Sequence, residues 1–263
     1  MMKKRFSLLL IFVLVFSMIP ANTLKISAKA TAATTQAKNV TTKKTVKKGK
    51  KSVKTKKQRT VFIAAGHQKR GISSTERLAP GSSRRKAKLT SGTAGVRTHI
   101  PEYKTNLAIA KAAKKELEKR GYKVIMLRTT NSCSLSNQQR TKKANKSGAD
   151  IHICIHCNAA GSSARGPLVC VPGSSRYVGK KIFNRSRRLG SCLLSSVAKA
   201  VNKKSHGTIR SDYYTTINWA KIPTMILECG FLTNPTEDRQ LNSLSYQKKL
   251  ARGIANGVDK YFK

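Results

Sequence analysis

The segment 150–158 constrains the fold more than any other part of the sequence. It reads Asp-Ile-His-Ile-Cys-Ile-His-Cys-Asn and is followed at once by a loop of small residues, 159–163. Because successive side chains of a strand point to opposite faces, His152, Cys154 and His156 share one face and the three isoleucines share the other. Open α/β sheets place their ligands at loops that follow such strands. His156, the last histidine before the loop, is therefore the best candidate catalyst or ligand on this strand.

Strand and helix patterns alternate along the rest of the chain. Besides the central strand, short apolar strands are expected at 60–65, 122–128, 167–171 and 223–229, and helical periodicity predicts helices from Pro101 to about Gly121 and at 136–146, 185–204 and 245–262. This alternation implies a single α/β domain with a mostly parallel, twisted sheet and helices on both faces. Residues 68–98 lack periodicity and are expected to form a long loop that acts as a rim or lid.

The first 58 residues are expected to lie outside this domain. A basic start precedes an apolar run at 8–19, and an A-x-A site follows at 28–30. This pattern is typical of a secretory signal peptide over residues 1–30, a retained amphipathic anchor being the alternative, and the run is too short to span a bilayer. Residues 31–58 contain no acid and no aromatic residue, which predicts a disordered basic linker. The folded domain would then occupy 59–263.

The positive charge is not confined to the linker. The formal net charge is +44, and residues 1–58 account for only 15 of the 54 Lys and Arg, so residues 59–263 still carry a net +29. Such an excess indicates a polyanionic partner, although it could serve only solubility and export. Because the chain lacks the signatures of nucleic-acid-binding modules, anionic wall polymers are favoured over a specific nucleic acid. No later segment predicts stable membrane insertion.

The six cysteines invite a disulfide interpretation in an exported chain. However, Cys154, Cys170 and Cys229 lie inside apolar strand patterns, where a free cysteine behaves as a small hydrophobic residue. We therefore expect mostly reduced, buried thiols.

Four ionisable residues lie at element ends that could converge: His67 after the first strand, Glu102 at a helix start, His156, and Glu228 at the end of the last strand. Two histidines and one carboxylate supply the three protein ligands of a catalytic Zn²⁺ site and leave a position for water. A further carboxylate, here Glu228, can move a proton to a leaving nitrogen. Alternatively, Glu102 only complements the dipole of the helix that it begins. Sets of two histidines and one glutamate are also common in proteins without any metal site.

The other histidines are weaker candidates. His152 lies deeper in the strand and is expected in the core. His99 precedes Glu102 by three residues and could replace it as a ligand. His206 lies among Lys and Gly and is expected to be solvated.

Three other acids also need an assignment. Glu76 lies in the long loop and could swing into the site, but nothing in the sequence orients it. Glu237 and Asp238 follow Asn234-Pro235 and look like a turn and helix start.

Five motifs together resemble one family. Ala65-Gly-His-Gln68, Pro101-Glu-Tyr-Lys104, Arg128-Thr-Thr-Asn131, Ile155-His-Cys-Asn-Ala159 and Leu227-Glu-Cys-Gly-Phe-Leu-Thr-Asn-Pro235 follow the order seen in the zinc-dependent N-acetylmuramoyl-L-alanine amidases. The resemblance covers roughly residues 60–262.

This resemblance implies that His67, Glu102 and His156 hold one Zn²⁺ per chain and that Glu228 is the catalytic acid/base. It also implies that the protein cleaves the amide between the lactyl group of N-acetylmuramic acid and L-alanine of the peptidoglycan stem peptide. We expect a monomer, secreted and associated with the cell wall. The substrate-binding residues are not identified by these motifs.

The chain departs from the family pattern at the turn 68–71, at Asn131 and at Cys157, positions that bear on the fine structure of the substrate. Two other functions stay open. One is a cationic wall-binding protein without turnover. The other is a zinc peptidase that cuts within the stem peptide.

Overall fold

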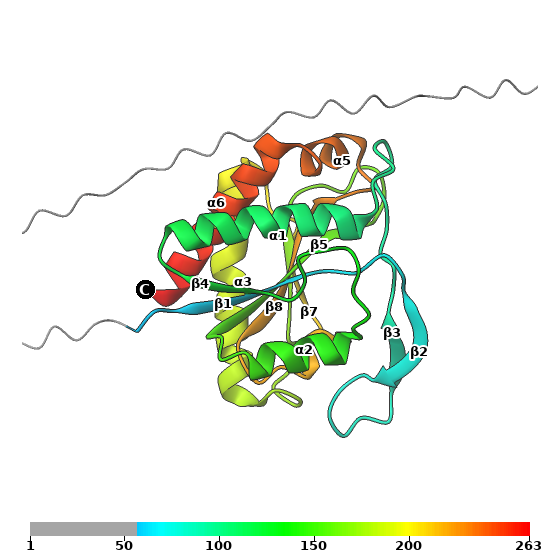
Figure 1. Ribbon diagram of the computed structural model, residues 1–263, viewed down its shortest axis with the longest axis vertical. Coiled ribbons are helices and arrows are strands. Elements are labelled where there is room, and N and C mark those ends of the chain that lie inside the picture. Colours follow the sequence, from blue (N-terminus) through cyan, green and yellow to red (C-terminus); the bar gives the residue numbers. More distant parts are fainter. Residues whose placement is uncertain (1–56) are drawn as a thin grey trace, which may run out of the picture. The chain divides into compact units, whose positions relative to one another are not determined.

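The structure of the chain is a computed structural model, and it describes residues 57–263 (Figure 1). The predicted signal peptide, 1–30, and all but the last two residues of the predicted linker, 31–58, lie outside the described residues. Over the described range, none of the helices combines the length and the apolar character that a membrane crossing needs.

A six-stranded sheet forms the centre of the domain. Its strand order is β4 (Lys123–Met126), β1 (Thr60–Ala65), β5 (Ile151–Asn158), β8 (Thr224–Phe231), β6 (Leu168–Val171) and β7 (Gly207–Arg210). The first four strands run parallel to one another, β6 runs antiparallel to β8, and β7 runs parallel to β6. The predicted single α/β domain with a mostly parallel sheet is therefore confirmed.

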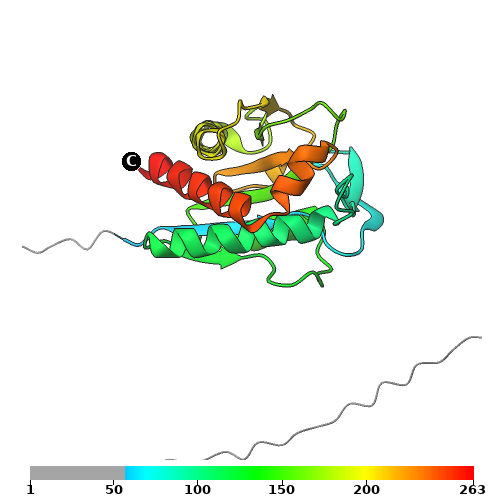
Figure 2. The same ribbon diagram turned by 90° about the horizontal axis from the view of Figure 1, so that it is seen from above.

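Helices cover both faces of the sheet, as predicted. One face carries α1 (Glu102–Lys119), α3 (Gly179–Val201) and α6 (Leu244–Phe262), and the other carries α2 (Asn137–Lys146) and α4 (Thr215–Asn218). Figure 1 shows α1 and α2 on opposite sides of the sheet, and Figure 2 shows α6 beside α1. The remaining helix, α5 (Pro235–Leu241), follows directly after β8.

The two faces of β5 contribute to two separate cores, as its alternation predicts. The isoleucines and Cys157 pack with α1, α3 and α6, whereas Cys154 packs with Phe62 and Ile217 on the opposite face. His152 is fully buried, its ring edge-on to Phe62 at 5.2 Å, which confirms it as a core residue.

None of the six cysteines forms a disulfide, and all but Cys133 are buried. Burial raises the pKa of the Cys170 thiol to about 12, and it also raises the pKa of Cys154 and Cys157. These thiols therefore stay protonated and act as small apolar groups, as expected.

Residues 68–98 are not the irregular loop that their composition indicated. They contain an antiparallel hairpin of β2 (Ile72–Arg77) and β3 (Arg85–Leu89), which forms a separate two-stranded sheet. β2 is mostly exposed, whereas β3 has two exposed, two half-buried and one buried residue. A ribbon that packs neither face into an apolar core needs no alternation of apolar and polar residues, so its sequence shows no strand periodicity.

Four other elements differ from the prediction. The helix expected at 185–204 begins at Gly179, and β7, α4 and α5 were not predicted. Helices α4 and α5 are only four and seven residues long, which is too short for a repeating apolar stripe. Glu237 and Asp238 do lie in the first turn of α5, as their sequence context indicated.

Two glycines let α6 pack directly against the backbone of α3. A Cβ atom added at Gly257 would lie 2.7 Å from the Cα atom of Leu193, and one added at Gly253 would lie 2.7 Å from the Cα atom of Val197. Neither contact is with a side chain that could turn away, so only glycine permits this interhelical distance.

We predict that Gly257→Ala lowers the free energy of unfolding by about 2 kcal/mol, because the cost of overpacking exceeds the gain in helix propensity. Chemical denaturation of the full chain measures this change. The control is Arg252→Ala on the exposed side of the same helix, expected to change stability by less than about 0.5 kcal/mol. Equal stability of Gly257→Ala and the wild type would contradict the close packing.

Asp238 fastens the segment that leads into α1. Its carboxylate accepts hydrogen bonds from the backbone N–H groups of Arg97 and Thr98, at 2.7 and 2.8 Å, and from the Thr98 hydroxyl at 2.6 Å. Burial alone would raise the pKa of Asp238, but the hydrogen bonds from Thr98, Arg97 and Asn242 outweigh it and lower this pKa. The carboxylate is therefore the form that stabilises the fold.

Asp238→Asn should destabilise the chain by about 2 kcal/mol at pH 7, since it removes charge-assisted hydrogen bonds. A lowered folded-state pKa contributes stability above the unfolded-state pKa of about 4, and this contribution is lost as the pH falls through the folded value. The gap between wild type and variant, measured by denaturation, should therefore shrink at about pH 3. A difference in stability that stays constant with pH would argue against this role. The control is Glu118→Gln at an exposed position, which should differ from the wild type by almost nothing at either pH.

Candidate active site

The carboxyl ends of the parallel strands β1, β5 and β8 meet at one edge of the sheet, and three of the four predicted site residues come from them. His67 lies two residues after β1, and His156 lies near the end of β5. Glu228 lies on β8 directly opposite His156 in the strand register. The fourth residue, Glu102, is the first residue of α1 and is 3% exposed.

The side chains of His67, Glu102 and His156 converge. His67 Nε2 lies 3.2 Å from Glu102 Oε2, and His156 Nδ1 lies 3.2 Å from Glu102 Oε1. One candidate ligand atom from each residue can be chosen so that all three lie within 4.8 Å of one another. The two imidazole rings meet edge to face with their centroids 4.8 Å apart.

Glu102 is held by its own hydrogen bonds as well as by the histidines. Oε2 accepts the backbone N–H of Thr93, and Oε1 accepts the backbone N–H of Cys157 and the side-chain amide of Asn106. Burial alone would raise the pKa of Glu102, but hydrogen bonds from His156 and His67 hold it well below its usual range. Glu102 is therefore a fixed, ionised carboxylate.

The two imidazoles differ in their surroundings. Burial lowers the pKa of His156 despite the nearby Glu102. For His67 burial acts in the same direction, but the hydrogen bond and charge of Glu102 outweigh it and raise the pKa. His67 Nδ1 lies 2.7 Å from the carbonyl oxygen of Thr90, which can only accept, so this nitrogen carries a proton, while Nε2 faces Glu102 Oε2.

The backbone reaches the site through two positions that tolerate only glycine. A Cβ atom at Gly66 would lie 2.3 Å from His156 Cε1, so the chain after β1 could not pass this ring with a larger residue. A Cβ atom at Gly92 would lie 2.5 Å from Glu102 Oε2, and the φ angle of Gly92 is +84°. His67 itself has a φ of +53°, a left-handed conformation that non-glycine residues rarely adopt.

Two buried arginines hold the loop that carries His67. Arg128 donates to the carbonyl oxygens of Ala65, Gly66 and Tyr103. Arg140 donates to the carbonyl oxygens of Ala65 and His67 and to the side chain of Gln68. Burial and the neighbouring Arg140 lower the pKa of Arg128 to about 10, and neither guanidinium pairs with a carboxylate within the described residues.

Neither arginine is among the site residues expected from the sequence. Arg128 is the first residue of the motif Arg128-Thr-Thr-Asn131, so its place in a family motif could have identified it. Arg140 lies in a polar helix with many cations, and only its tertiary contacts set it apart from its neighbours.

Glu228 faces a cavity of about 220 Å³ that His67 and His156 also line. Its Oε2 atom is buried and has no hydrogen-bond partner within residues 57–263. Burial, and to a smaller extent the charge of Glu102, raise the pKa of Glu228 to about 8. The carboxyl group can therefore both take up and release a proton near neutral pH.

The donor set fits a metal ion of the zinc type. Two imidazole nitrogens and one carboxylate are the ligands of a three-coordinate protein site that keeps a position open. The groups behind them are also typical of such sites, since Thr90 orients His67 and Asn106 orients Glu102.

The alternative residues lie elsewhere. His99 is exposed and is not part of the converging group, so it does not replace Glu102. His206 is exposed, as expected, with its ring edge-on to Phe231. Glu76 does not swing into the site: it is buried and accepts the backbone N–H of Gln138 in the first turn of α2, so the tertiary structure supplies the orientation that the sequence lacked.

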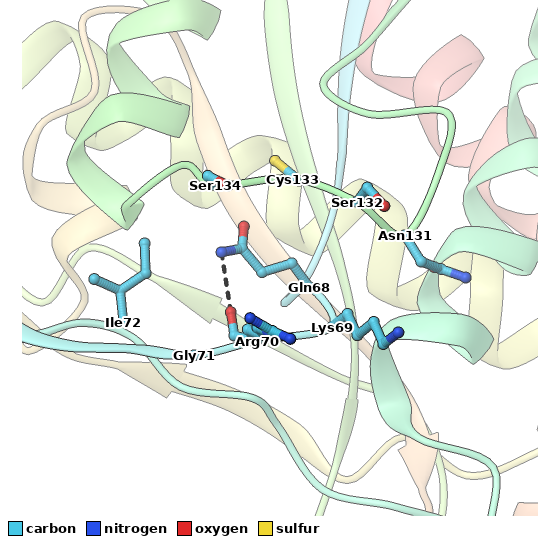
Figure 3. A pocket seen from close by; sticks show the side chains of 9 residues that line it. All are labelled: Gln68, Lys69, Arg70, Gly71, Ile72, Asn131, Ser132, Cys133 and Ser134. Atoms are coloured by element: carbon cyan, nitrogen blue, oxygen red, sulfur yellow. Dashed lines mark hydrogen bonds between the residues drawn. The ribbon is translucent and has the colours of Figure 1, made fainter.

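A second hollow, of about 610 Å³, begins at the residue after His67 (Figure 3). It lies between segment 68–72 and segment 131–134, and its lining includes the cations Lys69 and Arg70 but no acid. Figure 3 shows the hydrogen bond from the Gln68 side-chain amide to the carbonyl oxygen of Arg70, which is 3.0 Å long. Two of the three family departures noted in the sequence, the turn 68–71 and Asn131, thus line one hollow.

Comparisons with known proteins agree with this geometry. Residues 61–260 match the family described as N-acetylmuramoyl-L-alanine amidase. The chain is 31% identical to the Bacillus subtilis protein YqiI over 60% of this chain and 72% of that protein. It is 26% identical to the N-acetylmuramoyl-L-alanine amidase AmiA of Salmonella typhimurium, over 78% of this chain and 84% of AmiA.

The fold has a counterpart among solved structures. The crystal structure of the N-acetylmuramyl-L-alanine amidase Ami1 from Mycobacterium smegmatis superimposes with a TM-score of 0.70, covering 77% of this chain and 96% of that one at 20% sequence identity. At this identity the likeness supports the fold alone. The family match extends over most of the described residues and includes all four residues of the site, and we conclude that the chain belongs to the N-acetylmuramoyl-L-alanine amidase family of hydrolases.

Proposed function

We propose that this amidase is zinc-dependent and secreted, and that it hydrolyses the amide between the lactyl group of N-acetylmuramic acid and L-alanine of the peptidoglycan stem peptide. The observation that carries the proposal is the convergence of His67, Glu102 and His156 beside a cavity into which Glu228 also faces. The family match supports the substrate class.

In this proposal His67, Glu102 and His156 would hold one Zn²⁺. When bound, the ion supplies Lewis-acid chemistry that makes water nucleophilic near neutral pH. Glu102 stays ionised because three N–H donors besides the histidines fix it, so it is a ligand and not a proton carrier.

Glu228 is the proton carrier. Its unpartnered Oε2 accepts a proton from the attacking water, whose oxygen bonds to the lactyl carbonyl carbon. The same proton then goes to the alanine nitrogen as the C–N bond breaks. The products are the free lactyl carboxyl group and a stem peptide with an amino-terminal L-alanine, so the water's atoms are divided between the two fragments.

Digestion of purified sacculi tests the bond that is cleaved. We expect mass spectrometry of the released material to find new L-alanine amino termini. New amino termini at other stem residues would identify a peptidase instead, and tight binding without release would identify a wall-binding protein. Either of the last two results would overturn the proposal.

A variant of Glu228 separates proton transfer from metal binding. Glu228→Gln should bind one Zn²⁺ per chain with unchanged affinity, because the ligand set is untouched, yet lose at least about 100-fold in turnover. Metal analysis and turnover of a soluble muropeptide measure the two effects. His156→Ala is the matched control and should lose the metal; loss of metal in Glu228→Gln would contradict the assigned role.

Retention on the wall is the second part of the proposal. Residues 1–30 act as a signal peptide and 31–58 as a basic linker, and the domain 59–263 acts as a monomer. The ten lysines of the linker and the net +29 of the domain bind anionic wall polymers. The family match supports a location at the cell wall, where the proposed substrate lies.

Deleting residues 31–58 should weaken binding to sacculi at low salt and change turnover of a soluble muropeptide by less than about twofold. The binding difference should vanish at about 1 M salt, where charges are screened within about 3 Å. A co-sedimentation assay measures it, with a matched chain in which the ten lysines are replaced by glutamine. Unchanged binding of both variants at low salt would exclude this role for the linker.

A further inference from the structure

The β2–β3 hairpin places one cation at the catalytic cavity. Lys86 of β3 lines the cavity of about 220 Å³ that His67, His156 and Glu228 also line. Its side chain is half-buried. None of the sequence motifs above includes this residue, because the hairpin itself was not predicted.

The Lys86 ammonium group is fixed in place. Nζ donates a hydrogen bond to the carbonyl oxygen of Tyr213 at 3.1 Å and lies 3.8 Å from the centroid of the Tyr213 ring. The Arg84 guanidinium lies 5.3 Å from the same centroid. Cation–π contact and a backbone acceptor thus hold a lysine that would otherwise turn to solvent.

Within the described part of the chain, no carboxylate neutralises this ammonium group. Among residues 57–263, no Asp or Glu oxygen lies within 4 Å of Lys86 Nζ. Its partner across the hairpin, Glu76, is directed to the backbone of Gln138 instead. Burial and the nearby Arg84 lower the pKa of Lys86, as expected for a cation without a counter-ion. Of the three N–H donors, only one is used within the described residues.

We propose that Lys86 binds a carboxylate of the stem peptide and makes the enzyme prefer an anionic peptide next to the cleaved bond. This inference rests on the proposed function. The lactyl carboxyl group is consumed in the scissile amide and the sugar carries no other acid, so an anion within reach of the cavity must belong to the peptide. A carboxylate bound to a half-buried ammonium forms a charge-assisted hydrogen bond.

Two soluble substrates that differ by one charge test the inference. They are N-acetylmuramoyl-L-alanyl-D-glutamate with its γ-carboxyl group blocked as a carboxamide, which leaves the α-carboxylate as its one peptide anion, and the counterpart in which the α-carboxylate is a carboxamide as well. We expect the wild type to cleave the carboxylate form with a kcat/KM at least about 10-fold higher, and Lys86→Met to reduce this ratio to about one by slowing only the carboxylate form. Lys86→Arg should restore part of the preference, because it keeps the charge.

Lys88→Met is the matched control. Lys88 lies on the same strand but does not line the cavity, so this variant should keep the wild-type ratio. An equal loss for both substrates in Lys86→Met would place Lys86 at the scissile carbonyl and overturn the proposal. The absence of a preference in the wild type would also overturn it.

Binding separates failure of this inference from failure of the proposed function. In the Glu228→Gln background, calorimetry should show that the carboxylate ligand binds about 10-fold more tightly than the carboxamide, and that Lys86→Met removes the difference. If neither compound is cleaved by the wild type but this binding difference is present, the assigned reaction is wrong and the Lys86 site stands. If cleavage occurs without any binding or rate difference, the reaction stands and the Lys86 site is wrong.

Discussion

The hydrogen bonds that the Glu102 carboxylate accepts connect parts of the chain that are far apart in the sequence. They reach the exit of the β2–β3 hairpin through Thr93, α1 through Asn106, the end of β5 through Cys157 and His156, and the loop after β1 through His67. A buried carboxylate is costly unless such donors satisfy it. Glu102 is thus both a candidate ligand and the group around which the strand edge, the helix start and the hairpin are positioned.

The site combines two glutamates, Glu102 and Glu228, with several cations that are held in place. Arg128 and Arg140 are buried and donate mainly to backbone carbonyl groups, so within residues 57–263 they hold the loop that carries His67 without pairing with a carboxylate themselves. Lys86 adds a cation to the lining of the cavity. In a chain with 54 basic and 10 acidic residues, the surplus charge extends from the surface into the site. The same excess that would retain the protein on an anionic wall is thereby available, at Lys86, to select an anionic peptide.

Several elements explain why sequence analysis succeeded in one place and failed in another. The central strand was predicted because both of its faces are buried in separate cores, so its isoleucines alternate with His and Cys. The β2–β3 hairpin was missed because it lies on the outside, where charged residues occupy both faces. Glu76 was left unassigned for a different reason. The N–H group that fixes its carboxylate belongs to Gln138 of α2, 62 residues later in the sequence.

By itself, the sequence determined the fold class, the order of the larger strands and helices, and the four residues that could form a zinc amidase site, because periodicity and motif order are properties of the chain alone. Only the tertiary structure decided that His67, Glu102 and His156 lie within reach of a single atom and that His99 does not. It also decided that two arginines support the loop after β1. It placed Lys86, which precedes Glu102 by 16 residues in the sequence, at the cavity. Distances between residues that the sequence separates depend on how the sheet, helices and hairpin pack, and no local pattern encodes them.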